Sequence, residues 1–218
     1  MGMLSAPTFW PLHDLRVGTH GLELRLASHS DLVALAQLAY DGVHDPAVMP
    51  FGVPWTDEAP DVRARSTMQW HWRSWADLSP ESWHLSFVVV SDGVVVGTQE
   101  LSAKQFAVRR EVHTGSWLGR EHQGKGIGKQ MRAAVLHLAF AELGALWATT
   151  AAFEDNPSSL GVTRRLGYQP DGMEIFERRG APATMLRYRL SLAEWQQTPR
   201  IEAVVSGLDP CRPLLGAA

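Results

Sequence analysis

A glycine-rich loop between an expected strand and an expected helix constrains the fold of this chain most strongly. The stretch TGSWLGREHQGKGIGKQMRAAVLHLAF, residues 114–140, begins as an extended apolar segment and ends with apolar residues at helical spacing. The loop between the two parts contains Gly119, Gly124, Gly126 and Gly128 with two lysines. Main-chain amides of such a loop, together with the positive end of a helix dipole, commonly bind phosphate. The sequence therefore predicts a phosphate-bearing ligand at this loop.

Three phosphate-binding patterns can be compared with the loop. A nucleotide-triphosphate loop, G-x-x-x-x-G-K-[S/T], needs a hydroxyl for Mg²⁺ where Gly126 stands. A dinucleotide loop, G-x-G-x-x-G/A, needs a small residue where Lys129 stands, because helix and strand pack closely there. The third pattern, Q/R-x-x-G-x-G/A, is satisfied at every position from Gln123 to Gly128. An exposed connector without a ligand is disfavoured by the position between strand and helix.

The loop and its flanks resemble the Gcn5-related N-acetyltransferase (GNAT) superfamily, in which the third pattern holds the pyrophosphate arm of coenzyme A. The preceding TGSWLG strand and the later segment NPSSLGVTRRLGY, residues 156–168, are similar to two further motifs of the family. The order of expected elements also agrees, from about Leu22 to Trp195. The text GSWLG and the serine at position 159 are most similar to the ribosomal-protein acetyltransferase branch, which has many non-ribosomal members.

The resemblance implies a coenzyme A thioester as acyl donor and no metal. The similar text TGSWLGR…HQGKGIG in an actinobacterial-type branch is associated with succinyl-CoA, so acetyl-CoA and succinyl-CoA both stay open. The donor-binding residues carried over from the family motifs are Trp117, Leu118, Gly119, Arg120, Gln123, Gly124, Lys125, Gly126, Ile127, Gly128, Lys129 and Asn156.

The reaction that the resemblance implies is direct attack of a primary amine on the thioester in a ternary complex, which needs a base and an acid. Most of the family places a tyrosine seven residues after the asparagine, but this chain has Thr163 there. Ser159 is therefore the candidate acid, although it can also serve only to start its helix. Glu100, at the end of a strand, is the first candidate base. The alternatives for the base are Glu111, His113, Asp155 and a water chain.

The acceptor is expected between the early helices and the loop that joins them. Trp55 and part of WHWRSW, residues 70–75, are predicted to wall its pocket, with Arg63, Arg65 or Arg73 holding a carboxylate. A small amine and a protein N-terminus or lysine both remain open. The missing tyrosine and the uncertain base leave a second hypothesis, a non-catalytic acyl-CoA-binding or regulatory module. The family is often dimeric, which implies a homodimer.

The pattern along the chain predicts an α/β fold with a mixed, mostly antiparallel sheet and helices on both faces. Strands are expected over residues 22–27, 83–90, 94–101, 111–118, 145–153, 173–179 and 183–195, and helices after Ser28 and over 61–78, 127–141 and 156–167. The resemblance adds a splay between the fourth and fifth strands of the family. We expect a single domain over residues 1–195, with an N-terminal extension over 1–20, and a tail over 196–218.

Composition excludes several other classes of protein. The 218 residues carry a net charge of −3, which gives no electrostatic footprint for nucleic acid or an anionic membrane. No run approaches the ~18 apolar residues of a membrane span, and no signal-like segment opens the chain, so a cytoplasmic location is expected. The single cysteine, Cys211, excludes an internal disulfide framework and a cysteine-rich metal site. The histidines are too scattered to predict a metal site.

Overall fold

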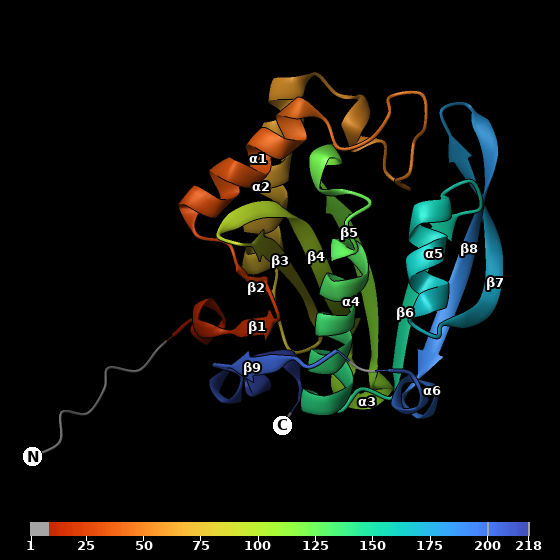
Figure 1. Cartoon of the computed structure of the whole chain (residues 1–218). Helices are drawn as coiled ribbons and strands as arrows, with labels where there is room; N and C mark the ends of the chain where they lie inside the picture. Colours follow the sequence, from red (N-terminus) through yellow and green to blue (C-terminus); the bar gives the residue numbers. More distant parts are fainter. Residues whose placement is uncertain (1–8, 200, 218) are drawn as a thin grey trace, which may run out of the picture.

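The computed structural model describes residues 9–199 and 201–217. Residues 1–8 of the expected N-terminal extension, and residues 200 and 218 of the expected tail, lie outside this description. The described residues form one mixed sheet with the strand order β7-β8-β6-β5-β4-β3-β2-β1-β9 (Figure 1). The strands are β1 (Arg16–Thr19), β2 (Leu22–Leu26), β3 (Ser82–Ser91), β4 (Val94–Lys104), β5 (Glu111–Leu118), β6 (Trp147–Phe153), β7 (Gln169–Arg178), β8 (Ala181–Ser191) and β9 (Val204–Ser206).

Helices cover both faces of this sheet, so the expected α/β fold class is confirmed. The longer helices are α1 (His29–Asp41) and α2 (Pro60–Ala76) on one face, and α4 (Ile127–His137) and α5 (Pro157–Arg165) on the other (Figure 1). The short helices are α3 (Phe106–Arg109), α6 (Leu192–Gln197), the 3₁₀ helices η1 (Pro11–Asp14), η2 (Trp55–Asp57), η3 (Arg120–His122) and η5 (Asp209–Leu215), and the π-helix η4 (Leu138–Glu142).

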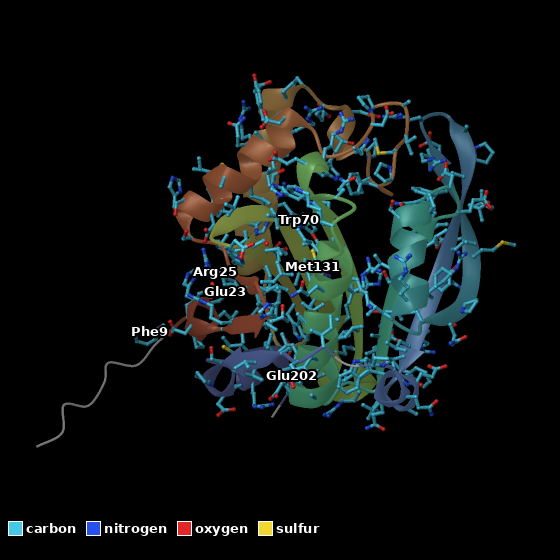
Figure 2. The ribbon with its side chains drawn as sticks, in the orientation of Figure 1. Phe9, Glu23, Arg25, Trp70, Met131 and Glu202 are labelled. Carbon is cyan, nitrogen blue, oxygen red and sulfur yellow. The ribbon has the colours of Figure 1, made fainter. Side chains whose placement is uncertain are left out.

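The core is divided by the sheet into two apolar layers, because successive side chains of a strand point to opposite faces. In β3, Leu85, Phe87 and Val89 join the larger layer beneath α4, whose Met131 is labelled in Figure 2. Val88 and Val90 join the smaller layer beneath α1 and α2. A strand buried on both faces explains the nearly continuous apolar run of this segment.

Local signals in the sequence place several of the element ends. Ser28 forms a capping box with Asp31 at the start of α1, and Asn156 caps α5 with Pro157 at the first turn. Asp92 and Gly93 adopt positive φ angles of 49° and 82° in the turn between β3 and β4. That conformation confirms the expected tight hairpin.

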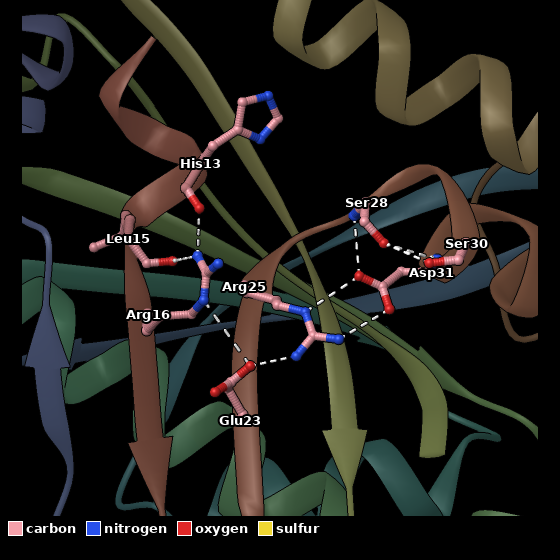
Figure 3. A network of polar contacts seen from close by, with 8 residues as sticks. All are labelled: His13, Leu15, Arg16, Glu23, Arg25, Ser28, Ser30 and Asp31. Atoms are coloured by element: carbon pink, nitrogen blue, oxygen red, sulfur yellow. Dashed lines mark hydrogen bonds and ion pairs between the residues drawn. The ribbon is translucent and has the colours of Figure 1, made fainter. Parts of the chain in front are cut away.

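A polar network ties β1 and β2 to the first helix (Figure 3). The Nε and Nη2 atoms of Arg25 donate to the Asp31 carboxylate at 3.2 and 2.9 Å. Burial alone raises the pKa of Asp31, but the hydrogen bonds from Arg25 and Ser28 outweigh it and hold the pKa below its ordinary value. The start of α1 is thereby fixed against β2, and the far end of the same helix lies next to the glycine-rich loop.

The end of β8 differs from the expectation. The expected last strand over residues 183–195 ends at Ser191, where a capping box with Glu194 begins α6. Beyond α6, the segment expected to form a tail adds β9 to the sheet edge against β1. The indole of Trp83 then donates to the main-chain oxygen of Leu215 at 2.9 Å, which holds η5 against the core.

Neighbouring strands run antiparallel except for β5 and β6, which are parallel and pair over a short stretch. Their register runs from Glu111 opposite Trp147 to His113 opposite Thr149. Beyond that point the two strands separate, leaving residues 114–118 of β5 without pairing on the β6 side. This opening, called the splay below, lies beside the helix that follows the glycine-rich loop (Figure 1).

Candidate active site

The glycine-rich loop presents its backbone rather than its side chains. Gly124 and Gly126 have φ angles of 73° and 83°, and an added Cβ at either position would meet nothing within 4 Å. Within the described residues, the amides of residues 124–128 donate to no other main-chain group. Gly126 is the N-cap of α4, so the helix dipole adds to these free donors. The loop fits an anion such as pyrophosphate, and the expected donor residues Gly124, Lys125, Gly126, Ile127, Gly128 and Lys129 all lie on it.

Gln123 fixes the loop between β5 and α1. Its Nε2 atom donates to the main-chain oxygens of Leu118 at 2.9 Å and Val43 at 2.7 Å. Gly119 packs so closely that an added Cβ would lie 2.8 Å from Leu38 of α1. The side chain of Gln123 is therefore occupied by the protein itself, and its contribution to a ligand comes through the position of the loop.

The expected pantetheine-binding segment, residues 117–120, covers the end of the splayed half of β5 and the two residues after it. The ring of Trp117 lies 5.7 Å from that of Trp55, on the face of α1 and α2. Leu118 is buried in the larger core layer, and Arg120 is exposed at the start of η3. The main chain of Trp117 and Leu118 has no strand pairing on the β6 side.

Side-chain hydroxyls close the inner end of the splay. Thr150 Oγ1 donates to the main-chain oxygen of Thr114 at 3.0 Å, and Thr114 Oγ1 lies 3.3 Å from the hydroxyl of Tyr168. These bonds satisfy polar groups at the point where the main-chain ladder ends. A ligand that enters along β5 must therefore stop near Thr114.

Helix α5 packs against α4 and β6, on the α4 face of the sheet. Asn156 Oδ1 accepts from the amide of Ser159 at 3.1 Å, so Asn156 acts as the N-cap. Thr163, which stands where the family tyrosine is expected, is fully buried. Its hydroxyl donates to the main-chain oxygen of Ser159 and accepts from Nη1 of Arg132, each at 2.9 Å. Thr163 is thus engaged within the protein, and Ser159 is the hydroxyl nearer the start of the helix.

A cavity of about 520 Å³ lies on the opposite face of the sheet, where β5 and β6 are still paired, next to the inner end of the splay. Its walls come from α2, α3, β3, β4, β5 and β6. The lining residues are Trp70, Arg73, Ser74, Asp77, Ser82, Trp83, His84, Ser102, Ala103, Lys104, Arg109, Glu111, Val112, His113 and Thr149. Aromatic and aliphatic surface combined with charges of both signs is typical of a site for a small polar molecule or a peptide end.

Glu100 lies between this cavity and the splay. Its Oε1 accepts from the indole of Trp70 at 3.0 Å, and its Oε2 lies 3.2 Å from Nε2 of His84. It pairs in register with Gly115 of β5, where an added Cβ would lie 2.9 Å from Oε2. Burial alone raises the pKa of Glu100, but the contacts with His84 and Trp70 outweigh it and lower the pKa below its ordinary value. Glu100 is therefore an ionised carboxylate next to a ring that lines the cavity.

The alternative bases are held in other contacts. Glu111 lines the cavity but forms ion pairs with Arg109 and Arg189. His113 lines the cavity and its Nδ1 lies 3.1 Å from Thr149 Oγ1. Asp155 forms a two-pronged ion pair with Arg178 on β7. Of these, only His113 faces the cavity without an ion pair among the described residues.

The structure separates the residues expected to wall the acceptor pocket. Trp70, marked in Figure 2, and Arg73 line the cavity, whereas Trp72 is exposed. Arg63 donates to three main-chain oxygens and holds the loop after α1, so it is not free for a substrate carboxylate. Trp55 packs against Trp117 with the two rings tilted by 44°, and it does not line this cavity.

Two residues next to the site were not predicted from the sequence. His84 reaches Glu100 only through the antiparallel pairing of β3 with β4. Arg132 lies on the buried face of α4, where the apolar spacing of the helix leads us to expect only apolar residues. A charged residue within an apolar helical stripe is the one signal that could have drawn attention to it.

Within the part of the chain described, no cluster of three or more potential metal ligands is present. The helices described there include none long and apolar enough to cross a membrane.

Comparison with known proteins agrees with this geometry. The acetyltransferase (GNAT) domain family model matches residues 21–169. Among solved structures, Mycobacterium smegmatis RimJ in complex with a CoA disulfide is similar with a TM-score of 0.71 and 20% identity, over 86% of this chain and 92% of that one. Vibrio cholerae spermidine N-acetyltransferase in complex with CoA and spermine gives 0.64 and 18%, over 82% and 99%.

A third similar structure is RimL, a ribosomal L7/L12 alpha-N-protein acetyltransferase in complex with coenzyme A. It gives a TM-score of 0.61 and 19% identity, over 78% of this chain and 94% of that one. At these identities the solved structures share the fold, while the family model covers more than half of the sequence. The chain therefore belongs to the GNAT acetyltransferase family.

Proposed function

We propose that the protein transfers an acyl group from a coenzyme A thioester to a primary amine by direct attack in a ternary complex. The observation that carries this proposal is the arrangement of two sites on opposite faces of one sheet. The loop with free amides lies at one end of the splay, and the cavity beside Glu100 opens on the other face. A thioester placed in the splay is accessible both from the loop, which binds the rest of the donor, and from the cavity, which binds the amine.

The donor is bound mainly by backbone in this proposal. The amides of residues 124–128 hold the pyrophosphate, and Lys125 and Lys129 add charge. The unpaired edge of β5 near residues 117–120 pairs with the pantetheine arm, and Asn156 contacts the arm from α5.

The chemistry follows from the groups around the splay. The amine nitrogen attacks the thioester carbonyl carbon, the carbon–sulfur bond breaks, and sulfur keeps the electron pair. The proton lost by the amine passes to the Glu100–His84 pair, in which Oε2 of Glu100 lies 3.2 Å from Nε2 of the ring. Ser159 then supplies a proton to the thiolate and recovers one from solvent. Proximity of the two bound substrates contributes to the rate.

The acyl group and the acceptor are the finer parts of the proposal. Both acetyl-CoA and succinyl-CoA are retained as donors. The similar structures name spermine and a ribosomal-protein N-terminus as partners of those proteins, which supports small polyamines and protein N-termini as the first acceptors to test. Asp77 in the cavity wall, which forms no ion pair among the described residues, suits a cationic acceptor, whereas Glu111 is already paired with Arg109 and Arg189. A cytoplasmic homodimer is proposed on the family resemblance and the single cysteine.

The decisive experiment is a transfer assay with acetyl-CoA and succinyl-CoA against a panel of amines, with free thiol released as the readout. We expect turnover with at least one donor, coupled to acylation of the amine detected by mass spectrometry. Turnover with acetyl-CoA alone would exclude the succinyl donor. Tight binding of coenzyme A without transfer in a single turnover would favour the non-catalytic module, which Thr163 at the tyrosine position also suggests.

A further inference from the structure

Arg132 is a buried cation without an anionic partner. Its side chain projects from α4 and the residue is 5% exposed. Nη1 donates to Thr163 Oγ1 at 2.9 Å and Nη2 to Ser116 Oγ at a long 3.4 Å, while Nε has no hydrogen-bond partner among the described residues. None of the ion pairs of the described chain includes it.

Such a group lowers the stability of the folded state. Removing a guanidinium from water is costly unless a carboxylate and a full set of hydrogen bonds compensate it. Burial lowers the pKa of Arg132, yet arginine stays protonated in proteins. The titratable group beside it, Tyr168, does not neutralise it, because burial raises the pKa of that phenol. We therefore expect an anionic group of a bound ligand to compensate the positive charge of Arg132, since the free protein supplies none.

The surroundings of Arg132 place that anion in the splay. Ser116, its contact on β5, belongs to the half of the strand that is unpaired on the β6 side. The preceding residue, Gly115, is in register with Glu100 on the opposite face. At this level of β5, the Glu100 carboxylate lies with His84 and His113 on the cavity face of the sheet. The Arg132 guanidinium lies on the α4 face.

We propose that Arg132 stabilises the coenzyme A thiolate that leaves during acyl transfer, acting through the hydroxyl of Ser116. This inference rests on the proposed function and deepens it. As the carbon–sulfur bond breaks, the electron pair stays on sulfur. The Ser116 hydroxyl, whose oxygen accepts from Arg132, donates its proton in a hydrogen bond to that sulfur. Arg132 transfers no proton and is a positioning residue, and protonation of the thiolate by Ser159 follows.

The test measures the thiol of bound coenzyme A directly. The ultraviolet absorbance of the thiolate is titrated with pH for coenzyme A bound to the wild type and to Arg132→Met, Arg132→Lys and Ser116→Ala. A nearby positive charge lowers an acid's pKa by about 1–3 units. We expect a lowered thiol pKa in the wild type, a rise of at least one unit in Arg132→Met, and a smaller rise in Arg132→Lys and Ser116→Ala. Arg165→Met removes an exposed cation from α5 and should leave the thiol unchanged.

Stability and kinetics separate this role from a structural one. A packed methionine in place of a buried unpaired cation should leave Tm unchanged or raise it, while kcat falls and KM for the donor stays similar. An unchanged thiol pKa in folded Arg132→Met overturns the proposal. If that variant does not fold, an unchanged thiol pKa in both Arg132→Lys and Ser116→Ala overturns it.

Two further arms separate this proposal from its alternatives. A loss of activity confined to succinyl-CoA would assign Arg132 to the carboxylate of the acyl group, and so overturns the thiolate role. An equal loss with every accepted donor supports it. If the wild type binds no coenzyme A, the proposed function itself fails. If the wild type binds and transfers but its bound thiol titrates like free coenzyme A, only the inference about Arg132 fails.

Discussion

Burial fixes the charge of His71, one turn from the cavity wall on α2. The residue is 1% exposed, and its Nδ1 atom has no hydrogen-bond partner among the described residues. Burial lowers the pKa of His71 to about 4, although Glu100 and the main chain of Ser86 act in the opposite direction. The ring is therefore neutral at pH 7, and it cannot neutralise Glu100.

This histidine predicts acid sensitivity. Between an unfolded pKa of 6.5 and a folded pKa of about 4, the unfolded state binds more protons, so stability falls as the pH falls through this range. The loss of folding stability caused by His71 reaches about 3 kcal/mol once the pH is below the folded pKa. Urea unfolding of wild type and His71→Gln at pH 7 and pH 4.5 should show a smaller loss in the variant. His29→Gln, an exposed residue on α1, serves as the control, and equal losses in wild type and His71→Gln would refute the assignment.

Glu100 is the second residue-scale prediction. Replacing the carboxylate with an amide in Glu100→Gln removes the charge that holds His84 but keeps the shape of the side chain. We expect kcat to fall by about 10²–10⁴-fold, the usual contribution of general base catalysis. Affinity for coenzyme A, measured by titration calorimetry, should change little because the donor loop lies elsewhere. Glu202→Gln, an exposed carboxylate near β9 (Figure 2), should leave both quantities unchanged. Full activity of Glu100→Gln would transfer the base role to His113 or to water.

Single residues could be predicted from the sequence where their role depends on neighbours along the chain. The loop glycines and Asn156 belong to this group, because the role of each is set by the start of a single helix. Gly126 is the N-cap of α4, and Asn156 is the N-cap of α5. His84 and Arg132 do not. Each acquires its partner from a strand or helix more than ten residues away, so only the three-dimensional pairing reveals it.

The donor loop provides the prediction at the scale of an element. Gly126→Asp puts a carboxylate at the N-cap of α4, where the pyrophosphate is proposed to bind. Repulsion between like charges costs several kcal/mol, so coenzyme A affinity should fall by more than about 100-fold. Calorimetric titration with coenzyme A measures this.

Gly21→Asp is the matched control for that variant. Gly21 has a φ of 78°, close to the 83° of Gly126, and an added Cβ meets nothing within 4 Å at either position. Both variants therefore carry the same backbone strain of about 1 kcal/mol, and both should lose a similar amount of stability. Only Gly126→Asp should lose coenzyme A. Equal affinities in the two variants would remove the loop from the donor site.

Elements were predictable wherever a local signal marks their ends. The β3–β4 hairpin follows from Asp92-Gly93, and α5 follows from Asn156-Pro157. The strand expected through Trp195 was wrong because the capping box of Ser191 and Glu194 overrides apolar alternation. The short β1 and β9 are stabilised by pairing with each other across the length of the chain, and local pattern carries no trace of that.

The whole molecule is a sheet that is continuous at one end and opened at the splay. The part of the sheet from β9 to β5 is held by antiparallel ladders and by α1, α2 and α4. The β6–β8–β7 part joins it through three register pairs at the inner end of the splay and through the hydroxyl bonds near Thr114. At the opposite sheet edge, the C-terminal segment adds β9, which pairs with β1.

Cys211 reports whether that C-terminal segment stays docked. It is fully buried, its Sγ donates to the Gly207 oxygen at 3.2 Å, and burial raises the pKa of the thiol to about 11. An added Cβ at Gly207 would lie 2.3 Å from the main-chain oxygen of Asp14, so Gly207→Ala must push the segment off the core. We expect slow reaction of the native thiol with a chromogenic disulfide at pH 8, and at least a tenfold faster reaction in Gly207→Ala, because a released thiol regains both exposure and an ordinary pKa.

Gly21→Ala is the control for this variant. Gly21 shares the left-handed backbone, with a φ of 78° against 71° at Gly207, but an added Cβ there meets no atom within 4 Å. Its thiol should react as slowly as that of the wild type, and an equal acceleration in both variants would show that strain, rather than the contact with Asp14, controls docking.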